Sequence, residues 1–182
     1  MALNHISFPQ GFLPIAVLLL AIHGKAALAA VESPFCSQTN PGDERILCNN
    51  LVNGAPTWQA ALTNVVEAGA KEVAPVKALI SNLPKVIPPD FASATKKSMV
   101  STCKESVDMF NGCITKILDN LKGRGPPDVS VDTELSAIFN SLSTCTDGLN
   151  EFGADSSQIQ KYTDLAYKYA SLGLAVSATK PK

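Results

Sequence analysis

Cysteine and histidine are the residue types of this chain that bear most directly on catalysis. The chain has two histidines, His5 and His23, and five cysteines, which are Cys36, Cys48, Cys103, Cys113 and Cys145. A nucleophilic cysteine or serine needs a base such as histidine, and catalytic zinc is commonly bound by histidine. Both histidines lie in an N-terminal segment that we expect to be removed. The remaining chain therefore cannot form such a nucleophilic system, and we expect no metal and no cofactor.

Paired carboxylates are the other route to catalysis, since a glycosidase needs only two Asp or Glu side chains at a suitable separation. Such sites usually lie on strand ends and loops near aromatic side chains. This chain has 6% aromatic residues and hardly any of the alternation typical of strands. Cys113 has no histidine to activate it, and its neighbours Phe110, Ile114 and Ile117 indicate a half-buried structural thiol. We therefore expect that the protein is not an enzyme.

An apolar run near the N-terminus predicts secretion. The run "GFLPIAVLLLAI", residues 11–22, is too short to cross about 30 Å of hydrocarbon but suits a secretory signal peptide. Ala27-Leu28-Ala29 follows as a cleavage pattern, so we predict a signal at 1–29 and a mature chain of 30–182; the alternative is an uncleaved anchor. The mature chain has 14 Lys and Arg against 16 Asp and Glu, a formal charge of −2. This balance predicts no binding to nucleic acid, and we expect no membrane association after cleavage.

Apolar residues recur at helical spacing through most of the mature chain. Thr57 is a predicted N-cap for a first helix that reaches Leu83 with a kink at Pro75. Asp90 is the next predicted N-cap, for a helix that ends before "KGRGPPD", residues 122–128. A third helix spans 135–152 and stops at Gly153, and a fourth begins at Ser156 or Ser157. Four amphipathic helices with short connections predict an all-α, antiparallel four-helix bundle over 57–179.

The segment 31–56 precedes this bundle and contains Cys36 and Cys48. Its centre, "NPGDE" at 40–44, is a predicted turn, so the two cysteines can lie on arms that fold back on each other. A disulfide between them would contribute about 3 kcal/mol. We therefore expect 31–56 to be a short hairpin closed by this bond.

The other cysteines leave two possible disulfides. Cys103 and Cys145 both lie on apolar helix faces of consecutive helices, and a bond between them would contribute about 4 kcal/mol. Cys113 lies slightly off the same face as Cys103. The preferred scheme is Cys36–Cys48 and Cys103–Cys145 with Cys113 as a free thiol, and Cys113–Cys145 is the alternative.

Three stretches resemble the plant invertase and pectin methylesterase inhibitor family. "CKESVDMFNG", from Cys103, resembles its Cys-x-Glu segment, and "ASLGLAV", residues 170–176, resembles its last-helix motif. "LSAIFNSLSTCTDGL", residues 135–149, is similar to its Leu-Ser-Ala and Thr-Cys-x-Asp-Gly signature. The resemblance covers essentially the whole mature chain, and it implies an N-terminal α-hairpin at 31–56, a four-helix bundle at 57–179 and both preferred disulfides.

The resemblance also implies a function. Family members bind a cell-wall enzyme and block its substrate cleft, which implies a secreted protein of the apoplast and cell wall. In the pectin methylesterase branch the second and third bundle helices pack against the enzyme. Carried over by motif, Glu105, Thr144 and Asp147 would bind the partner, and Asp108, which lies beside Met109 on the same helix, is a further candidate for partner binding.

Several departures from the family pattern leave the target open. Met109 and Gly112 stand where acidic or amide residues are usual, and the first two cysteines are twelve rather than nine residues apart. "GRGPPDVS" replaces the Pro-Lys-Phe loop of invertase inhibitors, which favours pectin methylesterase over acid invertase as the partner. The alternative from another class is a non-inhibitory secreted bundle with a structural or ligand-carrying role.

Overall fold

Every regular element of the described chain is helical. The computed structural model describes residues 32–126 and 130–181, and in these ranges it contains no strand, which confirms the all-α class. The predicted signal peptide lies outside the described residues, as does the end of "KGRGPPD". Among the residues described, no helix has the length and apolar character needed to cross a membrane. The elements are η1 (Pro34–Cys36), α2 (Asp43–Val52), α3 (Trp58–Val73), α4 (Val76–Val86), α5 (Ser93–Leu121), α6 (Val131–Ser141), α7 (Ser143–Glu151) and α8 (Ser157–Ser177).

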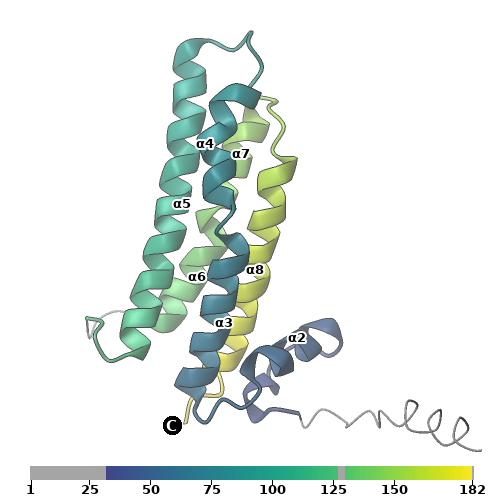
Figure 1. Ribbon diagram of the computed structural model, residues 1–182, viewed down its shortest axis with the longest axis vertical. Coiled ribbons are helices and arrows are strands. Elements are labelled where there is room, and N and C mark those ends of the chain that lie inside the picture. The colour runs from purple at the N-terminus through teal and green to yellow at the C-terminus, as the bar shows by residue number, and fades with distance from the viewer. Residues whose placement is uncertain (1–31, 127–129, 182) are drawn as a thin grey trace, which may run out of the picture. The chain divides into compact units, whose positions relative to one another are not determined.

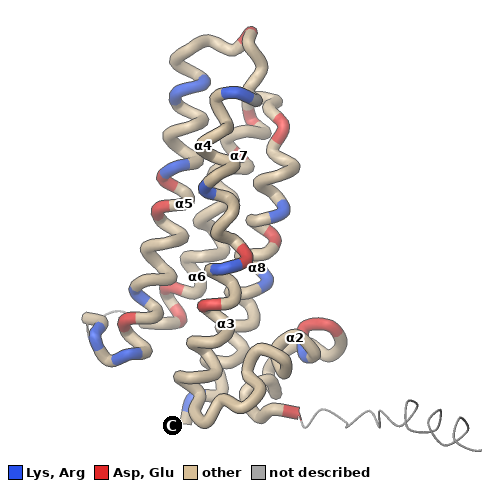
Figure 2. Tube along the Cα trace, in the orientation of Figure 1, with Lys and Arg blue, Asp and Glu red and all other residues tan. Residues whose placement is uncertain are grey.

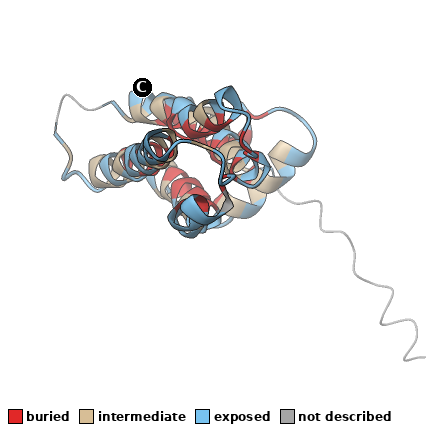
Figure 3. Ribbon diagram, turned by 90° about the horizontal axis from the view of Figure 1, so that it is seen from above, coloured by how far each residue is buried: buried red, intermediate tan, exposed pale blue. Residues whose placement is uncertain are grey.

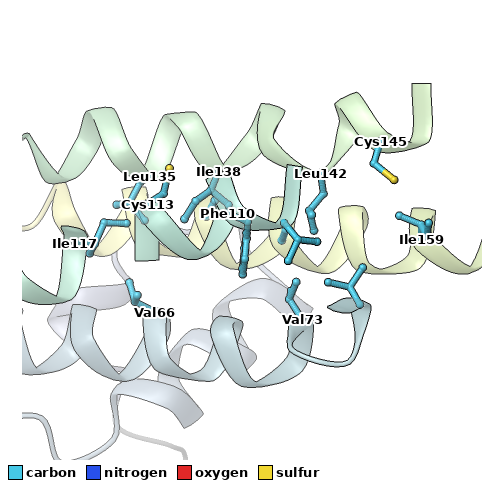
Figure 4. Packing of buried hydrophobic residues seen from close by; sticks show 14 of the residues in the cluster. Val66, Val73, Phe110, Cys113, Ile117, Leu135, Ile138, Leu142, Cys145 and Ile159 are labelled. Atoms are coloured by element: carbon cyan, nitrogen blue, oxygen red, sulfur yellow. The ribbon is translucent and has the colours of Figure 1, made fainter. Parts of the chain in front are cut away.

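Helices α3 to α8 form a helical bundle (Figure 1). Helix α8 packs against α3 and α6, and α5 packs against α4, α6 and α7. The buried residues lie on the inward sides of these helices (Figure 3), where the apolar repeat of the sequence places them. A close view of the core shows residues of different helices pointing toward one another, among them Phe110, Leu142 and Ile159 (Figure 4).

The first predicted helix is divided into α3 and α4. Thr57 is its N-cap as predicted, because its side chain accepts a hydrogen bond from the backbone N–H of Ala60 at 3.2 Å. The break falls at Ala74 and Pro75, both of which keep right-handed helical backbone angles. Proline has no N–H to donate and its ring displaces the preceding turn. The predicted kink at Pro75 is therefore present as the junction between the two helices.

The predicted N-cap at Asp90 is wrong. Helix α5 begins three residues later, at Ser93, and Ala92 occupies the cap position without a side-chain bond. Asp90 lies in a turn in which the N–H of Phe91 donates to the carbonyl of Pro88 at 3.4 Å. The pair Pro88-Pro89 favours extended or turn backbone, which delays the helix.

The third predicted helix bends at Leu142, which separates α6 from α7. Hydroxyl groups surround the bend. The side chain of Ser141 donates to the carbonyl of Ile138, and the side chains of Ser143 and Thr144 donate to that of Asn140. Such bonds compete with the helical N–H groups for the carbonyl oxygens and bend helices. Periodicity alone did not reveal this break, because the apolar repeat continues through it.

The start of α8 agrees with prediction, and a third residue contributes to it. Gly153 has φ +71° and ends the preceding turn, and Ser156 takes the cap position of α8. The cap bond comes from Asp155, whose side chain accepts from the N–H of Ser157 at 2.9 Å. This bond lowers the pKa of Asp155, because it stabilises the ionised carboxylate.

The segment before the bundle holds one α-helix and a short 3-10 turn. The Cys36–Cys48 disulfide joins η1 to α2 with a Cα–Cα distance of 5.9 Å. Arg45 fixes the connecting loop by an ion pair with Glu32 at 2.8 Å and by donating to the carbonyl of Thr39 at 2.7 Å. The predicted turn is present at Pro41 and Gly42, where Gly42 has φ +97°.

Two helical glycines should respond to alanine in opposite directions. Gly112 of α5 has open space where a Cβ would lie, so Gly112→Ala should raise the free energy of unfolding by about 1 kcal/mol through helix propensity. At Gly69 a Cβ would lie 2.7 Å from Cβ of Tyr169 on α8, so Gly69→Ala should lower it by about 1–2 kcal/mol. Urea unfolding of both variants measures the difference. Equal effects would contradict the close approach of α3 and α8.

Candidate functional site

A disulfide joins the two helices that carry the predicted partner-binding residues. Cys103 of α5 and Cys145 of α7 are bonded with a Cα–Cα distance of 4.4 Å, and both side chains are buried. This pairing and Cys36–Cys48 agree with the preferred scheme, whereas the alternative Cys113–Cys145 bond is absent, because Cys113 is free. The bond fixes α5 and α7 side by side. Two disulfides also fit a protein that folds in an oxidising compartment.

Three of the predicted residues are exposed next to this bond. Glu105 lies two residues after Cys103, and Thr144 and Asp147 lie on either side of Cys145. They are exposed because positions one before and two after a buried helical residue point away from the core. The Glu105 carboxylate accepts from Ser101 Oγ at 3.0 Å, and Thr144 Oγ1 donates to the carbonyl of Asn140 at 3.2 Å. No hydrogen bond or ion pair links the Asp147 side chain to the described part of the chain, so its carboxylate can accept bonds from a partner.

We call the exposed surface at Glu105, Met109, Thr144 and Asp147 the α5/α7 face. The two helices also meet at Gly148, where a Cβ would lie 3.7 Å from the side chain of Thr102. Met109, one of the departures from the family pattern, is 50% exposed. An exposed methionine adds an adaptable apolar contact to a surface that is otherwise polar.

Asp108 does not belong to this face. It lies with Lys77 and Ile80 of α4 around a hollow of about 180 Å³ between α4 and α5. Helical geometry explains the difference, because residue 108 is rotated by about 60° from residue 105 around α5. The two predicted partner-binding residues of α5, Glu105 and Asp108, therefore lie on different sides of that helix.

Cys113 is a buried thiol with an acidic neighbour. Figure 4 shows it near Ile117, Leu135 and Ile138 in the core. Glu134, which pairs with Lys116 at 3.1 Å, lies close enough to influence this thiol. Burial raises the pKa of Cys113 to about 11, and the neighbouring Glu134 carboxylate adds to the effect. The thiol therefore stays protonated and unreactive at neutral pH.

The Cys113 thiol should make stability fall at alkaline pH. In the unfolded chain it ionises near its ordinary pKa of 9.0, but in the folded chain only near 11. The unfolded state thus binds fewer protons between these values, so this contribution is complete below pH 9 and is lost as the pH rises to 11. Urea unfolding at pH 8 and pH 10.5 should show a larger loss for the wild type than for Cys113→Ala. Identical losses, or rapid alkylation of the native thiol at pH 8, would contradict this placement.

One group of charged residues was missed by the sequence reasoning. Lysines of α4 and α5 line two neighbouring hollows on the side of α5 where Asp108 lies. The sequence contained the evidence, since residues 74–104 include five lysines and one acidic residue, Asp90. Within the described ranges no group of three or more His, Cys, Asp or Glu side chains could hold a metal ion.

Comparisons of this chain with protein-family models, with curated proteins and with solved structures found no match.

Proposed function

We propose that the protein is a secreted inhibitor of plant pectin methylesterase, which it blocks by forming a stoichiometric complex over the substrate cleft. The proposal rests on the family resemblance at Thr144, Cys145, Asp147 and Gly148 and at the Cys103 segment. The corresponding fold is an antiparallel four-helix bundle preceded by an α-hairpin. The apoplast and cell wall are the corresponding location, and acid invertase is the second candidate target.

The observation that carries the proposal is the disulfide-linked pair of α5 and α7. The 4.4 Å Cα–Cα distance between Cys103 and Cys145 ties the two motif-bearing helices together. Thr144 and Asp147 are exposed beside the bond, and the Asp147 carboxylate has no partner in the described chain. A rigid surface that presents the unpaired Asp147 carboxylate suits binding, because little conformational entropy is lost when the complex forms.

The mechanism in this proposal is steric and needs no catalytic residue. A standard protein interface buries roughly 1,600 Å² in total, which is enough to cover the entrance of an enzyme cleft. Asp147 and Glu105 would pair with basic or hydrogen-bond donor groups of the enzyme, and Met109 would supply apolar contact. Inhibition then follows from exclusion of the polymeric substrate.

A charge reversal on the α5/α7 face tests the proposal. Asp147→Lys should raise the inhibition constant for pectin methylesterase at least about tenfold. The substitution replaces a hydrogen-bond acceptor by a positive charge, which would repel the basic groups of the enzyme that we expect Asp147 to meet. Asp90→Lys is the matched control, since Asp90 is also exposed but lies in the turn before α5, and it should change the constant less than twofold. Equal effects of the two variants would remove the α5/α7 face from the proposal.

A further inference from the structure

Positive charge is concentrated on α4 and on the first half of α5 (Figure 2). Residues 74–104 contain Lys77, Lys85, Lys96, Lys97 and Lys104 against one acidic residue, Asp90, a formal charge of +4. The other residues of the predicted mature chain carry nine Lys and Arg against fifteen Asp and Glu, a formal charge of −6. This separation of charge creates a local positive potential on an acidic protein.

The lysines border a depression along the junction of α4 and α5. One hollow of about 180 Å³ is lined by Lys77, Ile80, Ser81, Lys104, Val107 and Asp108. A second, of about 330 Å³, is lined by Pro84, Lys96, Lys97, Val100, Ser101 and Lys104. The two hollows share Lys104 and so adjoin. We call them together the lysine groove.

The ammonium groups of the groove have few partners within the protein. Both arginines and Lys116 form ion pairs with acidic side chains. Lys77, Lys96, Lys97 and Lys104 form none with the residues that the structure describes. Lys85 of α4, which does not line the groove, donates a hydrogen bond to Asn82 Oδ1 at 3.2 Å. Asp108 is the one acidic residue that lines the groove. A bound anion would therefore relieve repulsion between uncompensated charges.

The spacing and chemistry of the groove favour an extended, repeatedly charged ligand. Lys97 and Lys104 are separated by seven residues, or about 10 Å along α5. The lining has no aromatic side chain and no arginine, the residue types that dominate protein-binding hot spots. Lysine is a flexible point charge that suits single carboxylates along a chain rather than one fixed bidentate group. The apolar floor of Ile80, Val100 and Val107 suits the uncharged face of a sugar ring.

We propose that the lysine groove binds a linear polysaccharide that carries carboxylates on successive sugars, a polyuronate. The choice of this anion rests on the proposed function, because hydrolysis of methyl esters by the target enzyme turns a neutral polymer into one with free carboxylates. The inhibitor would then be retained where its target has already acted. The groove lies on the α4 side of α5 and the α5/α7 face on its α7 side, and the two surfaces adjoin at Ser101, which lines the groove and donates to Glu105 at 3.0 Å.

Direct binding of polygalacturonate in the absence of any enzyme tests this proposal. The probes are polygalacturonate, fully methyl-esterified polygalacturonate and polyglutamate of similar length, measured by calorimetry at 50 and 200 mM salt. The test variant is Lys77→Gln/Lys97→Gln/Lys104→Gln. The control is Lys71→Gln/Lys161→Gln/Lys168→Gln, which removes the same charge elsewhere on the surface. We expect polygalacturonate to bind the wild type and the control equally and the test variant at least tenfold more weakly, with no binding of the esterified polymer.

Three binding results would overturn the assignment. If the wild type did not bind polygalacturonate at 50 mM salt, the proposal would be wrong. If both triple variants bound it equally weakly, the binding site would lie outside the groove. Tighter binding of polyglutamate than of polygalacturonate would point to an acidic protein as the partner. Initial rates of ester hydrolysis on the fully methyl-esterified polymer, which we expect not to bind the groove, separate the two proposals. The test variant should still inhibit, whereas a wild-type protein that binds polygalacturonate without inhibiting would contradict the proposed function alone.

Discussion

Replacement of both Cys103 and Cys145 by alanine should lower the free energy of unfolding by about 4 kcal/mol. The bond closes a loop of 42 residues between α5 and α7, and loop-closure entropy in the unfolded chain gives an effect of this size. Both side chains are buried, so the variant also loses packing around the sulfur atoms. Urea unfolding of the variant and of the wild type gives the difference directly.

The other disulfide provides the matched control for this prediction. Cys36–Cys48 closes a loop of 12 residues, so removal of this disulfide should lower the free energy of unfolding by about 3 kcal/mol. This is less than the effect expected for the disulfide that closes the longer loop. If the free energy of unfolding fell less in the Cys103/Cys145 variant than in the Cys36/Cys48 variant, the entropic account would be wrong for this fold. The two variants should also differ in function, because only the bond between α5 and α7 holds the proposed binding face.

Replacement of Leu142 by alanine should lower the free energy of unfolding by about 3 kcal/mol. Leu142 is fully buried where α6 meets α7, and Figure 4 shows its side chain pointing into the core. Truncation of a buried leucine removes apolar contacts and leaves a cavity. Since the hydroxyl bonds of Ser141, Ser143 and Thr144 already weaken the helix here, we expect packing of Leu142 to be the main restraint on the bend.

A half-buried leucine serves as the control for Leu142. Leu165 of α8 lies at the edge of the core, so Leu165→Ala should cost roughly half as much or less. Thermal or urea unfolding of both variants makes the comparison. Equal losses would indicate that the α6–α7 junction can collapse around the missing side chain and is not fixed by Leu142.

Some parts of this fold could be predicted because their causes are local. Thr57 caps α3 and Gly153 ends a helical turn with a positive φ, and both are properties of a few neighbouring residues. The Cys103–Cys145 pairing followed from two cysteines on apolar faces of consecutive helices. The start of α5 was misplaced because Asp90 is a suitable cap by residue type, but the turn after Pro88 leaves it outside the helix.

The surfaces were harder to predict than the elements. The sequence makes Asp108 a candidate for partner binding together with Glu105, yet Asp108 lines the hollow toward α4. Which neighbour covers each side of α5 depends on packing that no local pattern encodes. The excess of lysine in 74–104 can be counted in the sequence, but that lysines of α4 and α5 line one groove follows only from the contact of the two helices in the folded chain.

The most direct test of the central proposal is a titration of the oxidised protein, residues 30–182, against a plant pectin methylesterase and a cell-wall invertase in parallel. The account predicts a saturable loss of esterase activity that is complete at one inhibitor per enzyme, with invertase unaffected. Loss of invertase activity alone would contradict the choice of target. If a folded, fully oxidised protein inhibited neither enzyme, the inhibitory function itself would be contradicted, and a non-inhibitory secreted bundle would take its place.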